Sequence, residues 1–338
     1  MFLSIVIPTW NRRESLRATL DGLARQDYPS SQFEVLVVSD GSTDGTDDFV
    51  RSYAAHASYA LILLVQANGG PARARNRGIN VAQGEIVVFL DDDVEPGPGF
   101  LSAHARHHEG SANTIVIGPL SPDPKVSHRE PPWIAWEHAM LQKQYVGWAT
   151  GLFNEVGPGN FYSGNASVRR TQLLAVGGYD EAFTRQEDVE LACRLERAFQ
   201  PDFVFDAAAD ALHRPRRSWA SWLAVPLAYG RLDVVRARRD DASWDVVREG
   251  YHARRRATQM LARLTWAAPA LAAPLRAVLR LSAQCAYCLG RAHTSFAALS
   301  VIYNLRYLDG AADEMGRRAL ADLLLPPTES PQGAQALP

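Results

Sequence analysis

The sequence contains very little lysine and cysteine, and each shortage removes a class of function. Of its 338 residues only Lys125 and Lys143 are lysines, and neither follows a GxxxxG segment, so there is no Walker A phosphate-binding loop. Three cysteines are too few for a disulfide framework, which favours a reducing, intracellular environment. No GxGxxG segment follows a predicted strand, and HExxH and GxSxG do not occur, so dinucleotide-binding, zinc-protease and serine-hydrolase signatures are missing.

The chain also lacks an excess of charge and a long apolar run. Lysine and arginine total 35 and aspartate and glutamate total 37, and this near balance gives no electrostatic reason to expect a nucleic-acid partner. No run of ~18 uncharged apolar residues exists, because arginines interrupt the apolar C-terminal region. The opening MFLSIVIPTW has no basic residue and soon reaches Pro8, so we expect no signal peptide. These features predict a cytoplasmic protein without a spanning helix.

What is present is the composition of a globular protein with room for two domains: 47% of the residues are hydrophobic and 21% are charged. Over residues 1–118, β-branched segments alternate with amphipathic ones near 14–26, 45–56, 71–83 and 99–108. Such alternation predicts a mainly parallel sheet covered on both faces, with ligands bound at the edge where its strands end. The predicted strands are Leu3–Ile7, Glu34–Val38, Leu61–Val65, Glu85–Leu90 and Thr114–Ile117.

The second part of the chain has a different character. Residues 119–165 are rich in proline, glycine and tryptophan, which predicts an irregular binding loop. A helix is expected from about Glu187 to Phe199 and a short strand near Phe203–Phe205. From residue 217 to about 325 the pattern is helical and rich in alanine, leucine and arginine, and the final residues read as a disordered tail.

The strongest local signal is VVFLDDDVEP, an apolar strand that runs into Asp91, Asp92 and Asp93. Neighbouring carboxylates favour a divalent cation, and oxygen ligands suit Mg²⁺ or Mn²⁺. Such an ion can neutralise a departing diphosphate. Alternate residues of a strand share one face, so Asp91 and Asp93 should point the same way. The alternative is a solvated acidic turn that caps the following helix.

Three other segments place polar residues after predicted strands. Asp40 could accept an N–H of a nucleotide base, or it could close an Asx turn or cap a helix. Polar residues in SIVIPTWNR could bind base, ribose or phosphate, and the arginines of NGGPARARNRG could bind phosphate. The residues concerned are Thr9, Asn11, Arg12, Arg75 and Asn76.

The later half offers further candidates, each with a plainer alternative. Glu187 and Asp188 open a helix, where they could supply a general base or simply favour the helix dipole. His213 could complete a metal site or contact phosphate, or it could be a surface histidine. Trp133, Trp136 and Trp148 could stack on a sugar or a lipid-linked acceptor, or pack in the core. We expect Cys285 and Cys288 to be packing residues.

Arginine is concentrated in one segment. Residues 213–256 contain 11 arginines and 5 acidic residues, an excess of 6. This excess could bind anionic lipid headgroups or a diphosphate-linked acceptor, or it could form a solvated helical face.

Seven segments occur in one order over residues 2–215: SIVIPTWNR, VVSDGSTDGT, NGGPARARNRG, FLDDDVEP, YSGNASVRR, GGYDEAF and the EDVEL helix. This order resembles the family 2 glycosyltransferases, which have the GT-A fold. The resemblance implies an α/β protein with a Rossmann-like, three-layer α/β/α nucleotide-diphospho-sugar transferase domain and a C-terminal helical extension. The implied parts are a nucleotide-sugar-binding half over 1–118, an acceptor-binding half over 119–215, a helical region over 216–325 and a tail over 326–338.

The resemblance further implies an inverting, metal-dependent transfer from a nucleotide-diphosphate sugar, foremost a UDP-sugar, to a hydroxyl acceptor in glycan or glycolipid biosynthesis. Asp40 matches the family's base-reading aspartate, Asp93 its principal Mg²⁺ or Mn²⁺ ligand and Asp188 its general base. The expected nucleotide-sugar contacts are Pro8, Thr9, Asn11, Arg12, Asp40, Arg75, Asn76, Asp91 and Asp92. The other expected site residues are Asp91, Asp93 and His213 for the metal, Gly164, Asn165 and Trp136 for the acceptor, and Glu187 beside Asp188.

The sequence departs from the family pattern in two places, and two rival functions stay open. Ser39 stands where an acid or asparagine is common, and HRPRRSW at 213–219 replaces the QxxRW-type motif, so we do not expect a processive synthase. One rival is a non-catalytic nucleotide-sugar-binding protein. The other is an aspartate-nucleophile phosphohydrolase, which needs a lysine, and both lysines lie within residues 119–165. The expected partners are the donor, a hydroxyl acceptor, no nucleic acid, and anionic membrane along residues 213–305.

Overall fold

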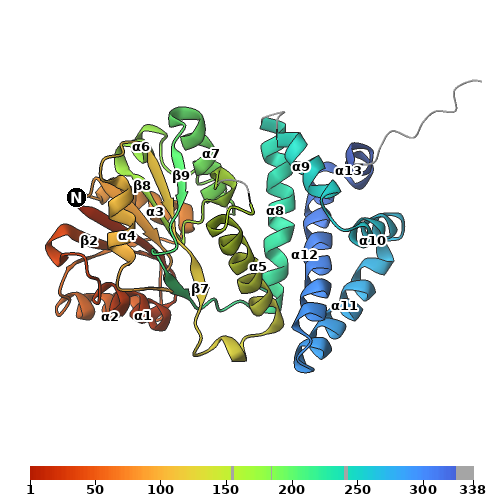
Figure 1. The fold of residues 1–338 in the computed structure, drawn as a ribbon, viewed down its shortest axis with the longest axis horizontal. Helices are drawn as coiled ribbons and strands as arrows, with labels where there is room; N and C mark the ends of the chain where they lie inside the picture. The colour runs from red at the N-terminus through yellow and green to blue at the C-terminus, as the bar shows by residue number, and fades with distance from the viewer. Residues whose placement is uncertain (154–155, 184, 240–242, 325–338) are drawn as a thin grey trace, which may run out of the picture. The chain divides into compact units, whose positions relative to one another are not determined.

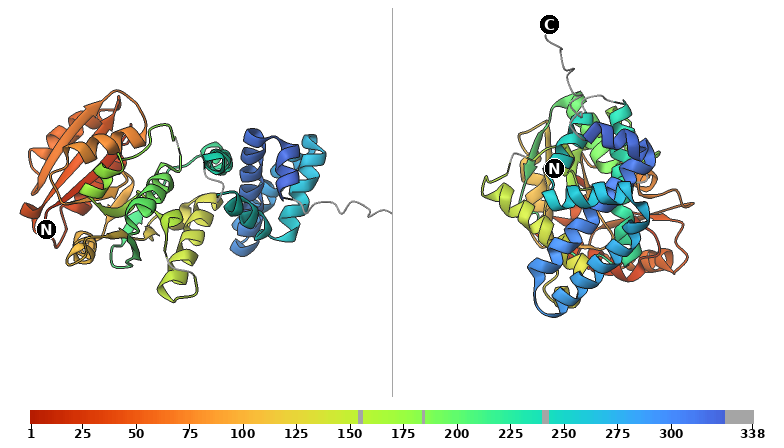
Figure 2. Two further views of the ribbon diagram at one scale, coloured as in Figure 1. Left: turned by 90° about the horizontal axis from the view of Figure 1, so that it is seen from above. Right: turned by 90° about the vertical axis from the view of Figure 1, so that its right-hand side faces the viewer.

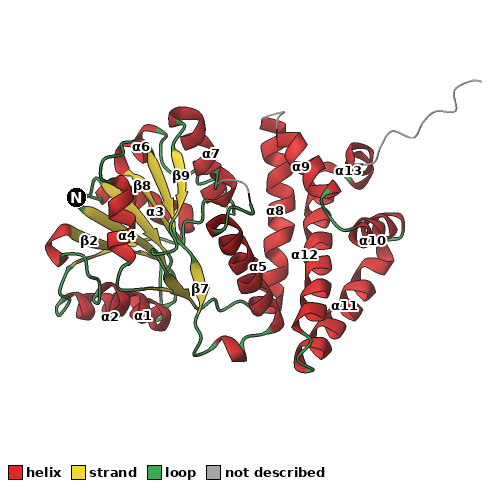
Figure 3. Cartoon of the chain, viewed as in Figure 1, coloured by secondary structure: helices red, strands yellow, loops and turns green. Residues whose placement is uncertain are grey.

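The computed structural model describes residues 1–153, 156–183, 185–239 and 243–324. The chain divides into two compact units, the first ending at Arg216 and the second beginning at Arg217. Figure 3 shows that the strands belong to the first unit, whereas the second unit is helical over its described residues.

A seven-stranded sheet forms the centre of the first unit, in the order β3-β2-β1-β4-β8-β6-β9 (Figure 1). Strands β3, β2, β1 and β4 are mutually parallel, and β8 runs antiparallel to both β4 and β6. Strand β9 pairs with β6 in parallel. The strands are β1 (Leu3–Thr9), β2 (Phe33–Asp40), β3 (Ala60–Gln66), β4 (Ile86–Leu90), β6 (Thr114–Ile117), β8 (Asn165–Arg169) and β9 (Asp202–Phe205).

Helices cover both faces of this sheet (Figures 1 and 2). Alternate residues of each central strand face opposite layers, so Ile5 packs with helices α1, α2 and α4 while Val6 packs with α3, α6 and α7. Both faces are therefore buried, which explains the continuous apolar runs of β1, β2 and β4. The helices are α1 (Arg13–Leu23), α2 (Thr46–Ala54), α3 (Pro71–Val81), α4 (Phe100–His108), α6 (Arg170–Ala175) and α7 (Glu187–Phe199). The predicted three-layer α/β/α fold is confirmed.

The prediction of an irregular segment over residues 119–165 is wrong for its central part, which forms helix α5 (Pro132–Ala149). Pro132 is at the start of the helix, where its fixed φ and missing N–H are tolerated, so a proline that suggests a loop here begins a helix.

A small second sheet was also not predicted. Strands β5 (Val94–Pro96), β7 (Leu120–Pro122) and β10 (Ala211–His213) form it in the order β5-β10-β7. Each has three residues, too few for an alternating pattern to be seen in the sequence.

The second unit consists of helices packed around α12 (Ala292–Met315). Helices α8 (Trp219–Arg239) and α11 (Ala272–Cys288) both pack against α12. At the crossing of α8 and α12, a Cβ on Gly230 would lie 1.9 Å from the carbonyl oxygen of Tyr307, and one on Gly310 would lie 1.9 Å from that of Leu227. The remaining helices are α9 (Ser243–His252), α10 (Arg256–Ala267) and α13 (Arg317–Leu324).

The helical prediction for residues 217–325 is thus confirmed over the described part, and the predicted tail at 326–338 lies outside the described residues. Among the helices that the structure describes, none has the length and apolar character needed to cross a membrane.

Candidate active site

The ends of β1 and β4 bring the first predicted site residues together. Pro8 pairs with Val38 inside the sheet, and Thr9 ends β1. The Thr9 hydroxyl donates a hydrogen bond of 2.7 Å to Oδ2 of Asp92, which follows the adjacent strand β4. The sheet edge predicted from the sequence therefore carries polar side chains that contact one another.

The three aspartates each have a different neighbour. Strand β4 ends at Leu90, so Asp91, Asp92 and Asp93 lie in the turn before β5, and the expected alternation of their side chains does not apply. Asp93 Oδ2 accepts a hydrogen bond of 3.2 Å from Arg12, an ion pair at the strand edge. The turn therefore directs each carboxylate separately.

Asp92 is the most buried of the three, with 9% of its surface exposed. Burial, followed by the charge of Asp93, raises the pKa of Asp92 to about 7, although the Thr9 hydroxyl opposes this shift. The Asp92 carboxyl group is therefore held against Thr9 and largely shielded from solvent.

Arg75 joins the aspartate turn to the start of helix α7. Its guanidinium donates to Asp91 Oδ1 at 2.8 Å and to Glu187 Oε1 at 2.9 Å. The Arg75 side chain is buried, and its guanidinium lies over the ring of Tyr179 at 5.6 Å. Two motifs that are far apart in the sequence thus share one arginine.

Helix α7 begins with Glu187 and Asp188, as predicted. Glu187 is buried and held by Arg75, whereas Asp188 keeps partial exposure. Burial, followed by the charge of Glu187, raises the pKa of Asp188 to about 7. A carboxylate with a raised pKa beside a second carboxylate is the environment expected of a general base.

His213 reaches the same place from β10. Its Nε2 lies 3.7 Å from Asp93 Oδ1, which is too long for a hydrogen bond but close enough for both atoms to contact one ion. Pairing of β10 with β5 sets His213 opposite Val94, the residue after the aspartate turn. The sequence could not show this pairing, although it indicated His213.

Glu130 and His138 were not predicted from the sequence. His138 on α5 is buried, and its Nδ1 lies 3.0 Å from Glu130 Oε2. Its ring packs edge to face on the ring of His213. No signal pointed to these residues, because their segment was expected to be irregular.

The donor types around Asp93 fit Mg²⁺ or Mn²⁺. Asp93 offers a carboxylate oxygen and His213 an imidazole nitrogen, both of which Mn²⁺ accepts. In the described ranges, which omit 154–155, 184, 240–242 and 325–338, no three His, Cys, Asp or Glu side chains gather as a metal site. Two protein ligands are nevertheless usual for Mg²⁺ sites that share the ion with substrate phosphates.

Asp40 ends β2 and binds the loop between β3 and α3. Its Oδ1 accepts from the Gly69 amide and the Gln66 side chain, and its Oδ2 from the Gly70 amide, all at 2.8 Å. The turn role considered for Asp40 belongs instead to Asp44, whose Oδ1 accepts from the amide and hydroxyl of Thr46. A contact between Asp40 and a nucleotide base stays a prediction.

Two asparagines of the predicted nucleotide-sugar contacts are used within the fold. Asn11 adopts a positive φ of 53° and its Oδ1 accepts from the Thr43 amide at 2.7 Å. Asn76 exchanges hydrogen bonds with both the amide and the carbonyl of Tyr179. Asn11 thereby joins two loops at the strand edge, whereas Asn76 holds the loop before α7 and is not brought to the aspartate turn.

The predicted acceptor residues are mostly interior. Asn165 has no exposed surface; its amide donates to the carbonyls of Pro119 and Ala209, and its Oδ1 contacts His104. Trp136 is also buried. As placed, neither side chain presents a surface to an acceptor, because each fills the interior. The structure therefore does not bring these two residues into the cluster.

Gly164 does lie beside the aspartate turn. Its carbonyl accepts from the Asp91 amide, and a Cβ at this position would come within 2.9 Å of Asp91 Oδ2. A side chain at this position, just before β8, would push the Asp91 carboxylate aside.

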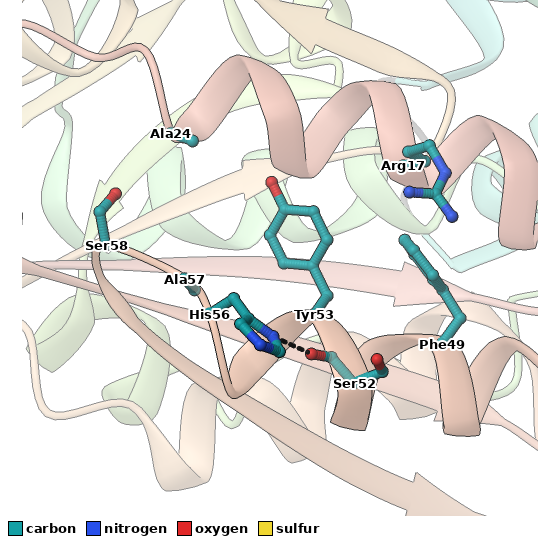
Figure 4. A pocket seen from close by; sticks show the side chains of 8 residues that line it. All are labelled: Arg17, Ala24, Phe49, Ser52, Tyr53, His56, Ala57 and Ser58. Carbon is teal, nitrogen blue, oxygen red and sulfur yellow. Dashed lines mark hydrogen bonds between the residues drawn. The ribbon is translucent and has the colours of Figure 1, made fainter.

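Two surface pockets lie near the N-terminal helices. One of about 260 Å³ contains Asn11 and Arg12 together with Arg13, Asp44 and Arg216, so it adjoins the predicted nucleotide site. The other, of about 390 Å³, lies between α1 and α2 and contains no predicted site residue. In Figure 4 the Tyr53 ring of this second pocket points from α2 toward α1, and the Arg17 guanidinium lies over Phe49.

Comparisons with known proteins identify relatives of this chain. The validoxylamine A glucosyltransferase of Streptomyces hygroscopicus subsp. jinggangensis is 34% identical over 214 residues, which cover 57% of this chain and 51% of that protein. The chain spans about half the length of the curated relatives it matches.

Two solved structures share the fold. One is the mannosyltransferase PcManGT from Pyrobaculum calidifontis, in complex with GDP-Man and Mn²⁺, with a TM-score of 0.55 at 22% identity. This match covers 90% of this chain and 86% of the PcManGT chain. Residues 1–349 of TarS from S. aureus, in complex with UDP-GlcNAc, match with a TM-score of 0.54 at 20% identity. This match covers 91% of this chain and 90% of the TarS chain.

The resemblance seen in the sequence is confirmed at the level of the family. The model described as glycosyl transferase family 2 matches residues 4–174, from β1 through α6. This match leaves the phosphohydrolase alternative without support. The chain belongs to glycosyl transferase family 2.

Proposed function

We propose that this protein is an inverting, metal-dependent glycosyltransferase. It transfers a hexose-type sugar from a nucleotide-diphosphate sugar, foremost a UDP-sugar, to a hydroxyl acceptor in glycan or glycolipid biosynthesis. The observation that carries this proposal is the Arg75 bridge, because it sets the aspartate turn beside the carboxylates that open α7. The aspartate turn, where the diphosphate would leave, then lies next to the proposed base, as a single displacement requires.

The proposed reaction has one chemical step. The acceptor oxygen forms a bond to the anomeric carbon while the bond from that carbon to the diphosphate breaks, through an oxocarbenium-like state. Asp188 takes the proton from the acceptor hydroxyl, because it is partly exposed while its neighbour Glu187 is held by Arg75. Configuration inverts because the acceptor enters opposite the leaving group.

The diphosphate is released at the aspartate turn. Arg12 lies there in contact with Asp93 and supplies positive charge. Asp93 and His213 would hold Mg²⁺ or Mn²⁺, with Asp91 nearby. When bound, the ion supplies the charge that neutralises the leaving diphosphate. Thr9, Asp40 and the backbone around Asn11 line the same strand edge and are the proposed contacts of the nucleoside.

The two structural neighbours support the donor class. One is a complex with UDP-GlcNAc and the other with GDP-Man and Mn²⁺. Because these proteins share the fold at about one-fifth identity, they support a nucleotide sugar and a divalent ion without selecting the base. A thermal-shift screen of UDP-, GDP- and dTDP-sugars with and without Mn²⁺ tests the donor, since binding to the folded state raises Tm.

The base assignment is tested by Asp188→Asn. Loss of a general base typically costs 10²–10⁴-fold in turnover, and we expect that loss while donor binding is kept. Asp202→Asn, an exposed acid on β9, is the matched control. Turnover within about threefold of the parent protein would show that Asp188 is not the base.

The metal site is tested by Asp93→Ala in calorimetry with UDP and Mn²⁺. We expect metal-dependent binding to be lost, and an unchanged affinity would contradict the ligand role. A protein that binds UDP-sugar but never releases UDP would instead be the non-catalytic binding protein.

A further inference from the structure

Part of the arginine excess of residues 213–256 is paired with acidic residues of the second unit. Arg231 pairs with Asp313, Arg236 with Asp233 and Arg238 with Glu314. These three arginines are neutralised within their own unit, so they offer little net charge to a lipid headgroup.

A segment that overlaps the end of this range is different, because it has no acidic residue. Residues 250–308 contain eight arginines and neither aspartate nor glutamate. Two of these arginines point into the unit: Arg276 pairs with Asp309, and Arg280 lies over the ring of Trp219. Four others are exposed, namely Arg255, Arg256, Arg263 and Arg291.

Helix α11 presents an uncharged surface to solvent. Its exposed residues, with Leu289 just beyond its end, recur at helical spacing and include no charged side chain. Val278 and Leu281 are 66% and 62% exposed, and Leu289 is 71% exposed. The set is Ala273, Pro274, Ala277, Val278, Leu281, Ser282, Cys285, Cys288 and Leu289. Cys285 and Cys288, which we expected to be packed, belong to this exposed set.

Helix α10 and the turn after it extend the same apolar character. Met260 is 69% exposed, and Leu264 and Leu271 are nearly half exposed. Arg256 and Arg263 stand on the same helix. Figure 1 shows α10 and α11 on the side of α12 away from α8, so within this unit no described helix covers them. We call the exposed residues of α10 and α11, with Leu271, Leu289 and the four exposed arginines, the α10–α11 face.

We propose that the α10–α11 face docks on the surface of an anionic membrane. An apolar helix face bordered by arginine, without acids, has the composition of a segment that lies in the lipid interface. Each arginine near an anionic bilayer is worth about fivefold in affinity, and the apolar side chains add to this. The proposal does not rest on the sugar-transfer activity.

The charge of the face argues against a second copy of the chain as its occupant. A twofold contact would set the face against itself, because such interfaces use the same patch on both subunits. Arginines would then meet arginines with no carboxylate in the face to neutralise them.

The test is co-sedimentation of the full chain with vesicles of phosphatidylcholine alone or with phosphatidylglycerol added. We expect binding to the anionic vesicles, weakened by salt, and at least about tenfold less with phosphatidylcholine alone. Val278→Glu removes apolar surface and adds a repelled charge, so it should weaken binding by about tenfold or more. Val81→Glu, at an exposed valine on α3, is the matched control and should bind like the parent protein.

Arg256→Gln and Arg263→Gln together should cost about twentyfold, whereas Arg51→Gln on α2 should cost little. Circular dichroism confirms that each exposed-site variant is folded. The proposal would be overturned by equal binding to both vesicle types, by no binding, or by a Val278→Glu variant that binds anionic vesicles as the parent protein does. So would a dimer in analytical ultracentrifugation that Val278→Glu dissociates. Because sedimentation needs no donor or acceptor, failure here is distinct from failure of the transferase function.

Discussion

The rings of His138 and His213 pack edge to face, with their centroids 5.6 Å apart and their planes at 78°. Glu130 fixes His138 from the other side through a contact of 3.0 Å. Helix α5 thereby supports the ring that stands beside Asp93. His138 is a positioning residue, since it acts through His213.

Loss of the His138 ring should loosen His213. We expect His138→Ala to weaken Mn²⁺-dependent UDP binding by about tenfold, the lower range for residues that orient metal ligands. Calorimetry with and without Mn²⁺ measures this. The double variant Glu130→Gln/His138→Phe keeps a ring against His213 and should retain most of the affinity. If both variants bind alike, the packing does not position His213.

The Arg75 bridge should be a source of stability as well as geometry. Arg75→Met leaves the carboxylates of Asp91 and Glu187 without their shared partner, which should lower the free energy of unfolding by about 3 kcal/mol. Adding Glu187→Gln removes one of these charges and should recover part of the loss. Urea unfolding of the three proteins tests this. If the double variant is no more stable than Arg75→Met, the unpaired charge of Glu187 is not the cause of the loss.

Stability should depend on pH through Asp92. Its pKa is raised to about 7 in the folded state, so the folded protein binds the proton more tightly than the unfolded chain. Stability from this group is therefore present at low pH and is lost as pH rises from about 4 to 7. Asp92→Asn keeps an acceptor for Thr9 and should raise Tm by roughly 4 °C at pH 8, with little gain at pH 4. Asp48→Asn, an exposed acid, should show no such difference.

Turnover should depend on pH through Asp188. A base must be ionised, and burial with Glu187 holds the pKa of Asp188 near 7, so kcat should fall as pH drops below that value. The measurement is kcat from pH 5 to 9 at saturating donor. Glu187→Gln removes the neighbouring negative charge and should move the acid limb to lower pH. If the acid limb of the kcat profile does not move in the Glu187→Gln variant, a group other than Asp188 controls it.

The two helix-crossing glycines allow a paired test in the second unit. Gly230→Ala forces a Cβ against the Tyr307 carbonyl and should cost at least about 2 kcal/mol. Gly250→Ala, on α9, meets only the end of the Arg254 side chain and should gain up to about 1 kcal/mol. Similar changes in thermal stability for the Gly230→Ala and Gly250→Ala variants would contradict the close approach of α8 and α12.

The central sheet could be predicted because each of its strands carries its own signal. Five apolar runs and four amphipathic segments identified β1–β4, β6 and their helices, and the aspartates were found because they follow such a run. Helix α5 was missed because proline and glycine around it suggested a loop. The second half of the site was harder, since Glu130 and His138 meet His213 only through tertiary packing.

Residue type alone does not show which side chains face the interior. Asn165 lies in a segment that resembles the family's acceptor region, and Trp136 was a candidate for stacking on an acceptor, and the structure buries both side chains. Only the fold distinguishes an amide that bonds Pro119 and Ala209 from one that faces a ligand.

The small sheet β5-β10-β7 sets a lower limit on how far the chain can be shortened. The family match ends at residue 174, but His213 is delivered to Asp93 by the pairing of β10 with β5, and the Arg214 amide donates to the Asp93 carbonyl. A truncation after residue 174 would keep the aspartate turn but lose the imidazole of His213 and the carboxylates that open α7. A fragment that retains the proposed site must therefore extend to about Arg216, where the first unit ends.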